Sequence, residues 1–156
     1  MNRIEAVRTR VHELLSAMPE ESESARQSAA AHLGGVAQAC AMLAMRRGED
    51  VETAVIAGML HDIAAYAAGC ADGHAHRGAD MARDILASLS CFAEDEIQTI
   101  CTAIYHHSDK ALSHDPFTEI LIDADVWQHC LHDPLLPPAA HEAERFARLK
   151  AEFGLR

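Results

Sequence analysis

The chain has 156 residues, of which 49% are hydrophobic and 4% aromatic, and its formal net charge is −11. This length suits a single domain with a substantial core, so we treat residues 1–156 as one domain. The acidic balance argues against duplex nucleic acid as a partner, because no basic patch offers the counterion release that such binding requires. A small anionic substrate is not excluded, since a bound dication would reverse the local field.

Helical periodicity runs through most of the sequence, and no segment alternates with the period of two that is typical of a strand. Abundant Ala and scarce aromatic residues favour closely packed helices. We therefore expect an all-α, compact bundle of six or seven helices. The expected helices cover, in chain order, about residues 2–18, 24–47, 49–69, 74–90, 94–107, a segment from 116 onward, and 138–153. We expect the helices at 2–18 and 138–153 to support the central ones.

Cysteine usage and the N-terminal residues bear on the compartment. The five cysteines are an odd number without a CxxC pair, which predicts reduced thiols in a cytoplasmic protein. The charged first turns do not resemble a signal peptide. The longest uncharged stretch, residues 27–45, contains too many polar residues to span a bilayer, and we interpret it as a buried helix. We expect no membrane partner, and a monomer or a homodimer.

Residues 57–66 place His61 and Asp62 side by side among apolar residues. An ionised carboxylate in a core is costly unless a partner neutralises it, and a metal cation would do so. Adjacent side chains on a helix diverge by roughly 100°. A metal shared by both residues must therefore lie near the helix surface. Taken alone, the doublet is equally consistent with a surface pair.

Further histidines lie at helix positions. His32 is in mid-helix among small residues that let another helix approach closely, and alone it would be read as a core histidine. His74 and His76 begin one expected helix, where single histidines are commonly exposed. His106 and His107 end another, a position that also favours histidine through the helix dipole.

The segment from residue 116 adds two carboxylates and two histidines. Asp123 and Asp125 are two residues apart, so they face different directions on a helix and only one is expected to reach a common site. We interpret Asp123 as a helix-surface charge, with a role in orienting a ligand as the alternative. His129 and His132 follow Asp125 on the same face, and we interpret them as surface or supporting residues.

Five phrases in this order resemble the HD-domain superfamily of metal-dependent phosphohydrolases, over about residues 28–131. They are HLGGV (32–36), AGMLHDI (57–63), HAHRGA (74–79), AIYHHS (103–108) and LIDAD (121–125). The resemblance implies an all-α fold with a buried metal centre. The family's four core ligands match His32, His61, Asp62 and Asp125.

The resemblance also implies a second metal. His74 and His107 match the two extra histidines of variants that hold two ions, with Asp62 bridging; His76 and His106 are the alternatives. Mixed imidazole and carboxylate ligation suits Fe, Mn, Ni, Zn or Co better than calcium. We therefore expect two divalent transition-metal ions.

The activity expected from the resemblance is hydrolysis of a nucleotide or other small phosphorylated metabolite through a metal-bound hydroxide. Asp62 takes part in catalysis through the metals. Lys110 and Arg77 are the cationic candidates for the substrate phosphate, and Lys110 is also a candidate catalytic residue.

Two other functions remain open. Some proteins with this fold and six ligands are oxygenases with a mixed-valent diiron centre, and the ligand set fits them equally. A non-catalytic regulatory module that keeps its metal for stability is the third. The substrate stays open: residues 63–66 lack the lysine of the branch that cleaves dinucleoside tetraphosphates, and the GYP phrase of the cyclic-dinucleotide branch is absent.

Overall fold

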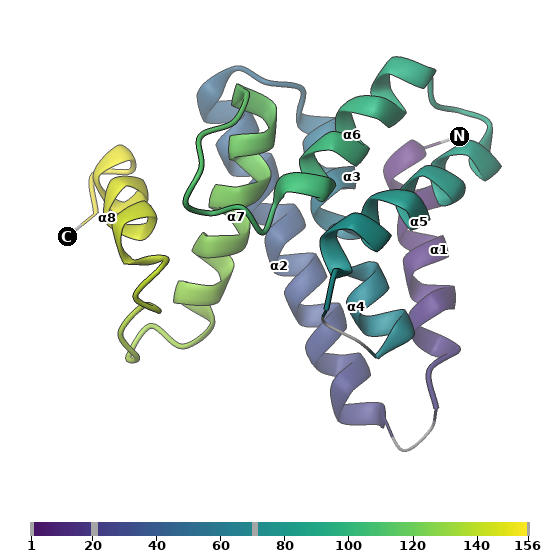
Figure 1. Ribbon diagram of the computed structural model, residues 1–156, viewed down its shortest axis with the longest axis horizontal. Helices are drawn as coiled ribbons and strands as arrows, with labels where there is room; N and C mark the ends of the chain where they lie inside the picture. The colour runs from purple at the N-terminus through teal and green to yellow at the C-terminus, as the bar shows by residue number, and fades with distance from the viewer. Residues whose placement is uncertain (1, 20–21, 70–71, 156) are drawn as a thin grey trace.

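The computed structural model describes residues 2–19, 22–69 and 72–155, and these ranges contain helices and no strand (Figure 1). The helices are α1 (Arg3–Ser16), α2 (Glu23–Arg47), α3 (Val51–Leu60), α4 (Ile63–Ala68), α5 (His74–Leu89), α6 (Glu94–His106), α7 (Pro116–His132) and α8 (Ala143–Glu152). When α3 and α4 are counted as one helix interrupted at two residues, the described chain has seven helices. The predicted all-α fold is confirmed.

Several helix ends follow directly from the sequence. The Asp50 side chain accepts a hydrogen bond from the backbone N–H of Thr53 and caps α3. Asp115 caps α7 in the same way, ahead of Pro116 at the first helical position. Gly48 ends α2 with a left-handed φ of 77°, which favours glycine because it has no Cβ.

Helix α2 packs against both α3 and α7, and small residues allow close approaches on both sides (Figure 1). A Cβ on Gly58 of α3 would lie 2.8 Å from the Cα of Ala37 in α2. A Cβ on Gly35 of α2 would lie 2.8 Å from the side chain of Gln128 in α7. Helices α5 and α6 pack against one another, and α6 also contacts α3 and α7. These contacts bring α2, α5, α6 and α7 around the residues between α3 and α4.

The expected helix over residues 49–69 is wrong in one respect, because it breaks at His61 and Asp62. Asp62 has φ −110° and ψ 9°, outside the helical region. The His61 ring donates to the backbone carbonyl of Gly58 at 2.8 Å. On the other side α5 approaches closely, since a Cβ on Gly78 would lie 3.0 Å from the carbonyl oxygen of His61. The break frees Asp62 from the divergence that a continuous helix would impose.

The last helix begins at Ala143, five residues later than expected from Pro138. The prolines are followed by a turn in which the N–H of Glu142 donates to the carbonyl of Ala139 at 2.9 Å. The turn places Glu142 in a buried position. Helix α8 therefore begins after this turn, next to the buried Glu142, and not at the prolines.

Two further predictions concern α2 and the cysteines. By length and composition α2 could cross a membrane, but a core helix of a soluble protein passes the same test, and half of its apolar window is buried here. The predicted lack of a membrane partner and the cytoplasmic location stay predictions. Four cysteines are free thiols in the structure, and Cys70 lies outside the described residues.

Candidate metal centre

The structure brings together all six residues that the sequence predicts as metal ligands. They come from the middle of α2, the break between α3 and α4, the first residue of α5, the residue after α6, and the middle of α7. They are His32, His61, Asp62, His74, His107 and Asp125. Their side chains form two groups of atoms that share Asp62.

The first group contains His32, His61, Asp125 and one oxygen of Asp62. The Nε2 atom of His32 lies 3.1 Å from Nε2 of His61, 3.5 Å from Oδ2 of Asp62 and 3.5 Å from Oδ1 of Asp125. The Nε2 atom of His61 lies 3.6 and 3.7 Å from the same two oxygens. Two ligand atoms that each lie about 2.1 Å from one metal are about 3.0–3.4 Å apart at octahedral or tetrahedral angles. The spacing of the four atoms is close to that requirement.

The second group contains His74, His107 and the other oxygen of Asp62. Oδ1 of Asp62 lies 3.2 Å from Nε2 of His74 and 3.2 Å from Nε2 of His107. The two imidazole nitrogens are themselves 3.2 Å apart. The three atoms thus form a nearly equilateral triangle. One oxygen of Asp62 faces each group, which is the arrangement of a bridging carboxylate.

Two carboxylate oxygens in these groups are buried without a hydrogen-bond partner in the described part of the chain, and they indicate whether the residues fit a metal. Oδ1 of Asp62 and Oδ1 of Asp125 are buried and have no hydrogen-bond partner among the described residues. Such orphaned acceptors are costly, and each one needs an explanation. A cation in each group would satisfy both oxygens, and the imidazole and carboxylate donors suit transition metals. The residues therefore fit a pair of divalent ions.

Hydrogen bonds on the outer side of the rings orient the histidines. Nδ1 of His32 lies 2.7 Å from the amide oxygen of Gln128. His61 and His107 donate from Nδ1 to the backbone carbonyls three residues earlier, at 2.8 and 2.7 Å. These bonds fix the tautomer and direct each Nε2 lone pair inward.

The electrostatics of the cluster keep both carboxylates ionised. Burial opposes ionisation of Asp62, but the imidazole groups of His107, His32 and His61 around it outweigh burial and hold the pKa of Asp62 well below its usual range. Burial also opposes ionisation of Asp125, where His61 and Lys110 lower the pKa in the same way. Both side chains are therefore in their cation-binding form at neutral pH.

Lys110 lies beside the centre, and it is paired with carboxylates. Its Nζ atom is 2.9 Å from Oδ2 of Asp125 and also pairs with Glu142. Glu142 accepts a second hydrogen bond from Nδ1 of His129 at 2.9 Å, and Nε2 of His129 lies 3.3 Å from Oδ1 of Asp125. Burial opposes ionisation of Glu142, but its bonds to Lys110 and His129 keep its pKa below normal. Glu142 therefore holds the side chains of Lys110 and His129 close to Asp125, which is one of the predicted ligands.

Sequence reasoning missed Glu142 and undervalued His129. His129 gave a usable signal, because it follows Asp125 by four residues on one face of α7. Glu142 gave none, since it lies beyond the proline-rich segment and only the fold brings it to the centre.

The alternatives left open by the sequence separate clearly in space. His76 is exposed and stacks on Tyr105, with ring centroids 3.9 Å apart. His106 bonds to Asp109 at 3.0 Å, away from Asp62. Arg77 is exposed on the first turn of α5 and donates to the backbone carbonyl of Asp72. His74 and His107 are thus the members of each pair that reach Asp62, and the phosphate contact predicted for Arg77 stays a prediction.

The interpretation of Asp123 as a helix-surface charge is wrong. Its side chain is buried and accepts from Arg47 at 2.7 Å and from Arg145 at 3.0 Å. Arg145 comes from α8, so the pairing depends on a segment far along the chain. Asp123 joins α2, α7 and α8 behind the centre.

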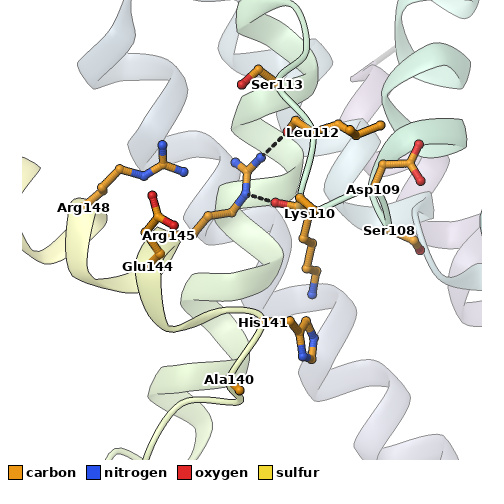
Figure 2. Close-up of a pocket in the computed structure, with 11 residues that line it drawn as sticks. Ser108, Asp109, Lys110, Leu112, Ser113, Ala140, His141, Glu144, Arg145 and Arg148 are labelled. Atoms are coloured by element: carbon orange, nitrogen blue, oxygen red, sulfur yellow. Dashed lines mark hydrogen bonds between the residues drawn. The ribbon is translucent and has the colours of Figure 1, made fainter.

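Two cavities adjoin the centre. One, of about 280 Å³, opens directly on His32 and Asp62, and its other walls are Ser28, Tyr66, Gln128, His129 and His132. Burial raises the pKa of Tyr66 to about 12, helped by Asp62 and Asp125, so its phenol remains a hydrogen-bond donor. The other, of about 720 Å³, lies between residues 108–113 and α8 and contains none of the six predicted ligands (Figure 2). The smaller cavity gives direct access to the predicted ligands.

Fold and site together define an all-α protein whose buried His and Asp groups could bind metal. The HD domain family matches residues 29–130, more than half of the chain. The chain belongs to the HD domain family, as its sequence resemblance predicts. HD domains are usually metal-dependent phosphohydrolases. Comparisons with curated proteins and with solved structures gave no match.

Proposed function

We propose that the protein is a metal-dependent phosphohydrolase that holds two divalent transition-metal ions on either side of Asp62. The observation that carries this proposal is the division of the Asp62 carboxylate. Its Oδ2 atom faces His32 and His61 at 3.5 and 3.6 Å, and its Oδ1 atom faces His74 and His107 at 3.2 Å. A structural site for one ion has no need of the second group.

Divalent ions bound in these groups would polarise a phosphoryl oxygen and lower the pKa of water, so that hydroxide is available near neutral pH. The residues of the chain hold the groups in place. Lys110 neutralises Asp125 from behind and is itself shared with Glu142, so we assign it to positioning Asp125 more than to binding phosphate. Its raised pKa, set by both carboxylates against burial, keeps it charged.

We assign substrate binding to the smaller cavity, which opens on His32 and Asp62. Tyr66 and Ser28 line it, and their hydroxyl groups can donate hydrogen bonds to phosphoryl oxygens. Among the described residues, no lysine or arginine lines it, so the metals and histidines would carry most of the compensation for phosphate charge. Its volume of about 280 Å³ favours a small phosphorylated metabolite, or the phosphate end of a nucleotide, as the substrate.

The proposal is tested with metal-reconstituted protein and a panel of phosphomonoesters, phosphoanhydrides and nucleotides, by release of inorganic phosphate. His74→Ala and His76→Ala form a matched pair, because both residues begin α5 and only His74 reaches Asp62. We expect His74→Ala to lose most of the activity and His76→Ala to keep it.

Two results would overturn the proposal. Equal activity of His74→Ala and wild type on the best substrate would show that the second metal group takes no part in the reaction. The second result is oxygen consumption by the iron-loaded protein without phosphate release from any member of the panel. It would show that the protein is a mixed-valent diiron oxygenase and not a hydrolase.

A further inference from the structure

A third group of metal-binding side chains lies outside the centre, where α6 is followed by the loop to α7. His106 is the last residue of α6, Asp109 lies in the following turn, and His114 precedes the cap of α7. Nδ1 of His106 is 3.0 Å from Oδ2 of Asp109. One ligand atom from each of the three residues lies within 4.8 Å of the others. Since His107 turns toward Asp62, neighbouring histidines serve different groups.

The ring spacing in this group resembles that of the main centre. The centroids of His106 and His114 are 4.7 Å apart, with an interplanar angle of 32°. In the main centre, the corresponding distances are 5.0 Å for His32 and His61 and 5.0 Å for His74 and His107. The two imidazoles are therefore as close together as pairs that share a predicted metal group.

An independent observation points to a ligand at this place. Nε2 of His114 is buried and has no hydrogen-bond partner among the described residues. A buried polar nitrogen left unpaired is costly, because it has lost its hydrogen bond to water and gained no replacement. The nearby carboxylate of Asp109 supplies negative charge, and its side chain is 45% exposed, which leaves room for water. A divalent cation would use the His114 ring and the charge of Asp109 together.

We propose that His106, Asp109 and His114 bind a further divalent ion of the zinc class. Two imidazoles and one carboxylate are a ligand set that suits Zn²⁺ and its neighbours, and water completes the coordination on the exposed side. This site goes beyond the proposed function, because neither the Asp62 groups nor the smaller cavity includes any of the three residues.

The site would act as a clamp on the loop over residues 107–115. Arg145 holds one side of this loop by donating to the backbone carbonyls of Lys110 and Leu112, both at 2.7 Å (Figure 2). An ion at the three residues would close the other side and tie the end of α6 to the start of α7. The same loop carries His107 and Lys110, so the clamp would help to hold both against the main centre.

The test is the number of Zn²⁺ ions bound per chain, measured by equilibrium dialysis of metal-free protein against Zn²⁺ and elemental analysis. Asp62→Ala should retain one ion, and Asp62→Ala combined with Asp109→Ala should retain none. His12→Ala, a change to an exposed histidine of α1, is the control and should leave the number unchanged. Asp109→Ala alone should bind one ion fewer than wild type, which covers the case in which the Asp62 variant does not fold.

The proposal is wrong if folded Asp62→Ala binds no Zn²⁺, or if Asp109→Ala binds as many ions as the protein from which it was made. Failure of the proposed function gives a different result. In that case Asp62→Ala and wild type bind the same number of ions, and the ion sensitive to Asp109 is still present.

Discussion

Glu142 provides a sharp test of how the centre is held, because it lies outside the residues matched by the HD domain family. Its side chain is 5% exposed and bonds to both Lys110 and His129, which in turn contact Asp125. Glu142→Gln keeps the size of the side chain but removes its charge. Lys110 then has Asp125 as its remaining carboxylate partner, and it competes more strongly with a metal for that ligand.

The expected size of the effect follows from the role of Glu142 as a supporting residue. Loss of a residue that orients a metal ligand typically lowers metal affinity about 10- to 100-fold. This range corresponds to about 1.4–2.7 kcal/mol. Affinity is measured by competition for Mn²⁺ or Zn²⁺ with a fluorescent chelator. Glu144→Gln is the control, since Glu144 is exposed two residues further along. Equal affinities of the two folded variants would refute the supporting role of Glu142.

Two predictions concern stability, measured by urea unfolding. Gly58→Ala places a methyl group 2.8 Å from the Cα of Ala37 and should lower the free energy of unfolding by about 1–3 kcal/mol. Gly34→Ala adds its methyl group in open space and should raise that free energy by about 0.5–1 kcal/mol. The opposite order of stabilities would contradict the packing between α2 and α3. Burial opposes ionisation of Glu119, but bonds from Arg145 hold its pKa below normal. Glu119→Gln should therefore destabilise the protein at pH 7, and the difference should shrink as pH falls below about 4.3 toward the folded pKa; a constant difference contradicts this.

The helices were predictable because their signals are local. Asp50 and Pro116 mark helix starts and Gly48 marks an end, and apolar spacing supplies the faces between them. The break at Asp62 was not predictable from local signals. It depends on the His61 ring reaching back to a carbonyl and on α5 approaching through Gly78.

The candidate site, like the fold, was predictable from the sequence only in part. The order of motifs indicated all six ligands and favoured His107, with His106 as the alternative. The direction of each side chain at the end of α6 then separates the two, because His107 faces Asp62 and His106 bonds to Asp109. Glu142 could not be found from the sequence, because its partners come from other segments.

The central claim is that Asp62 belongs to two metal groups at once. The most direct measurement is the number of bound transition-metal ions per folded chain in wild type, Asp62→Ala and His74→Ala, each reconstituted with Mn²⁺ or Zn²⁺. We predict that His74→Ala loses one ion and that Asp62→Ala loses two. Loss of one ion or none in folded Asp62→Ala would contradict the bridging role of Asp62 and, with it, the dinuclear centre.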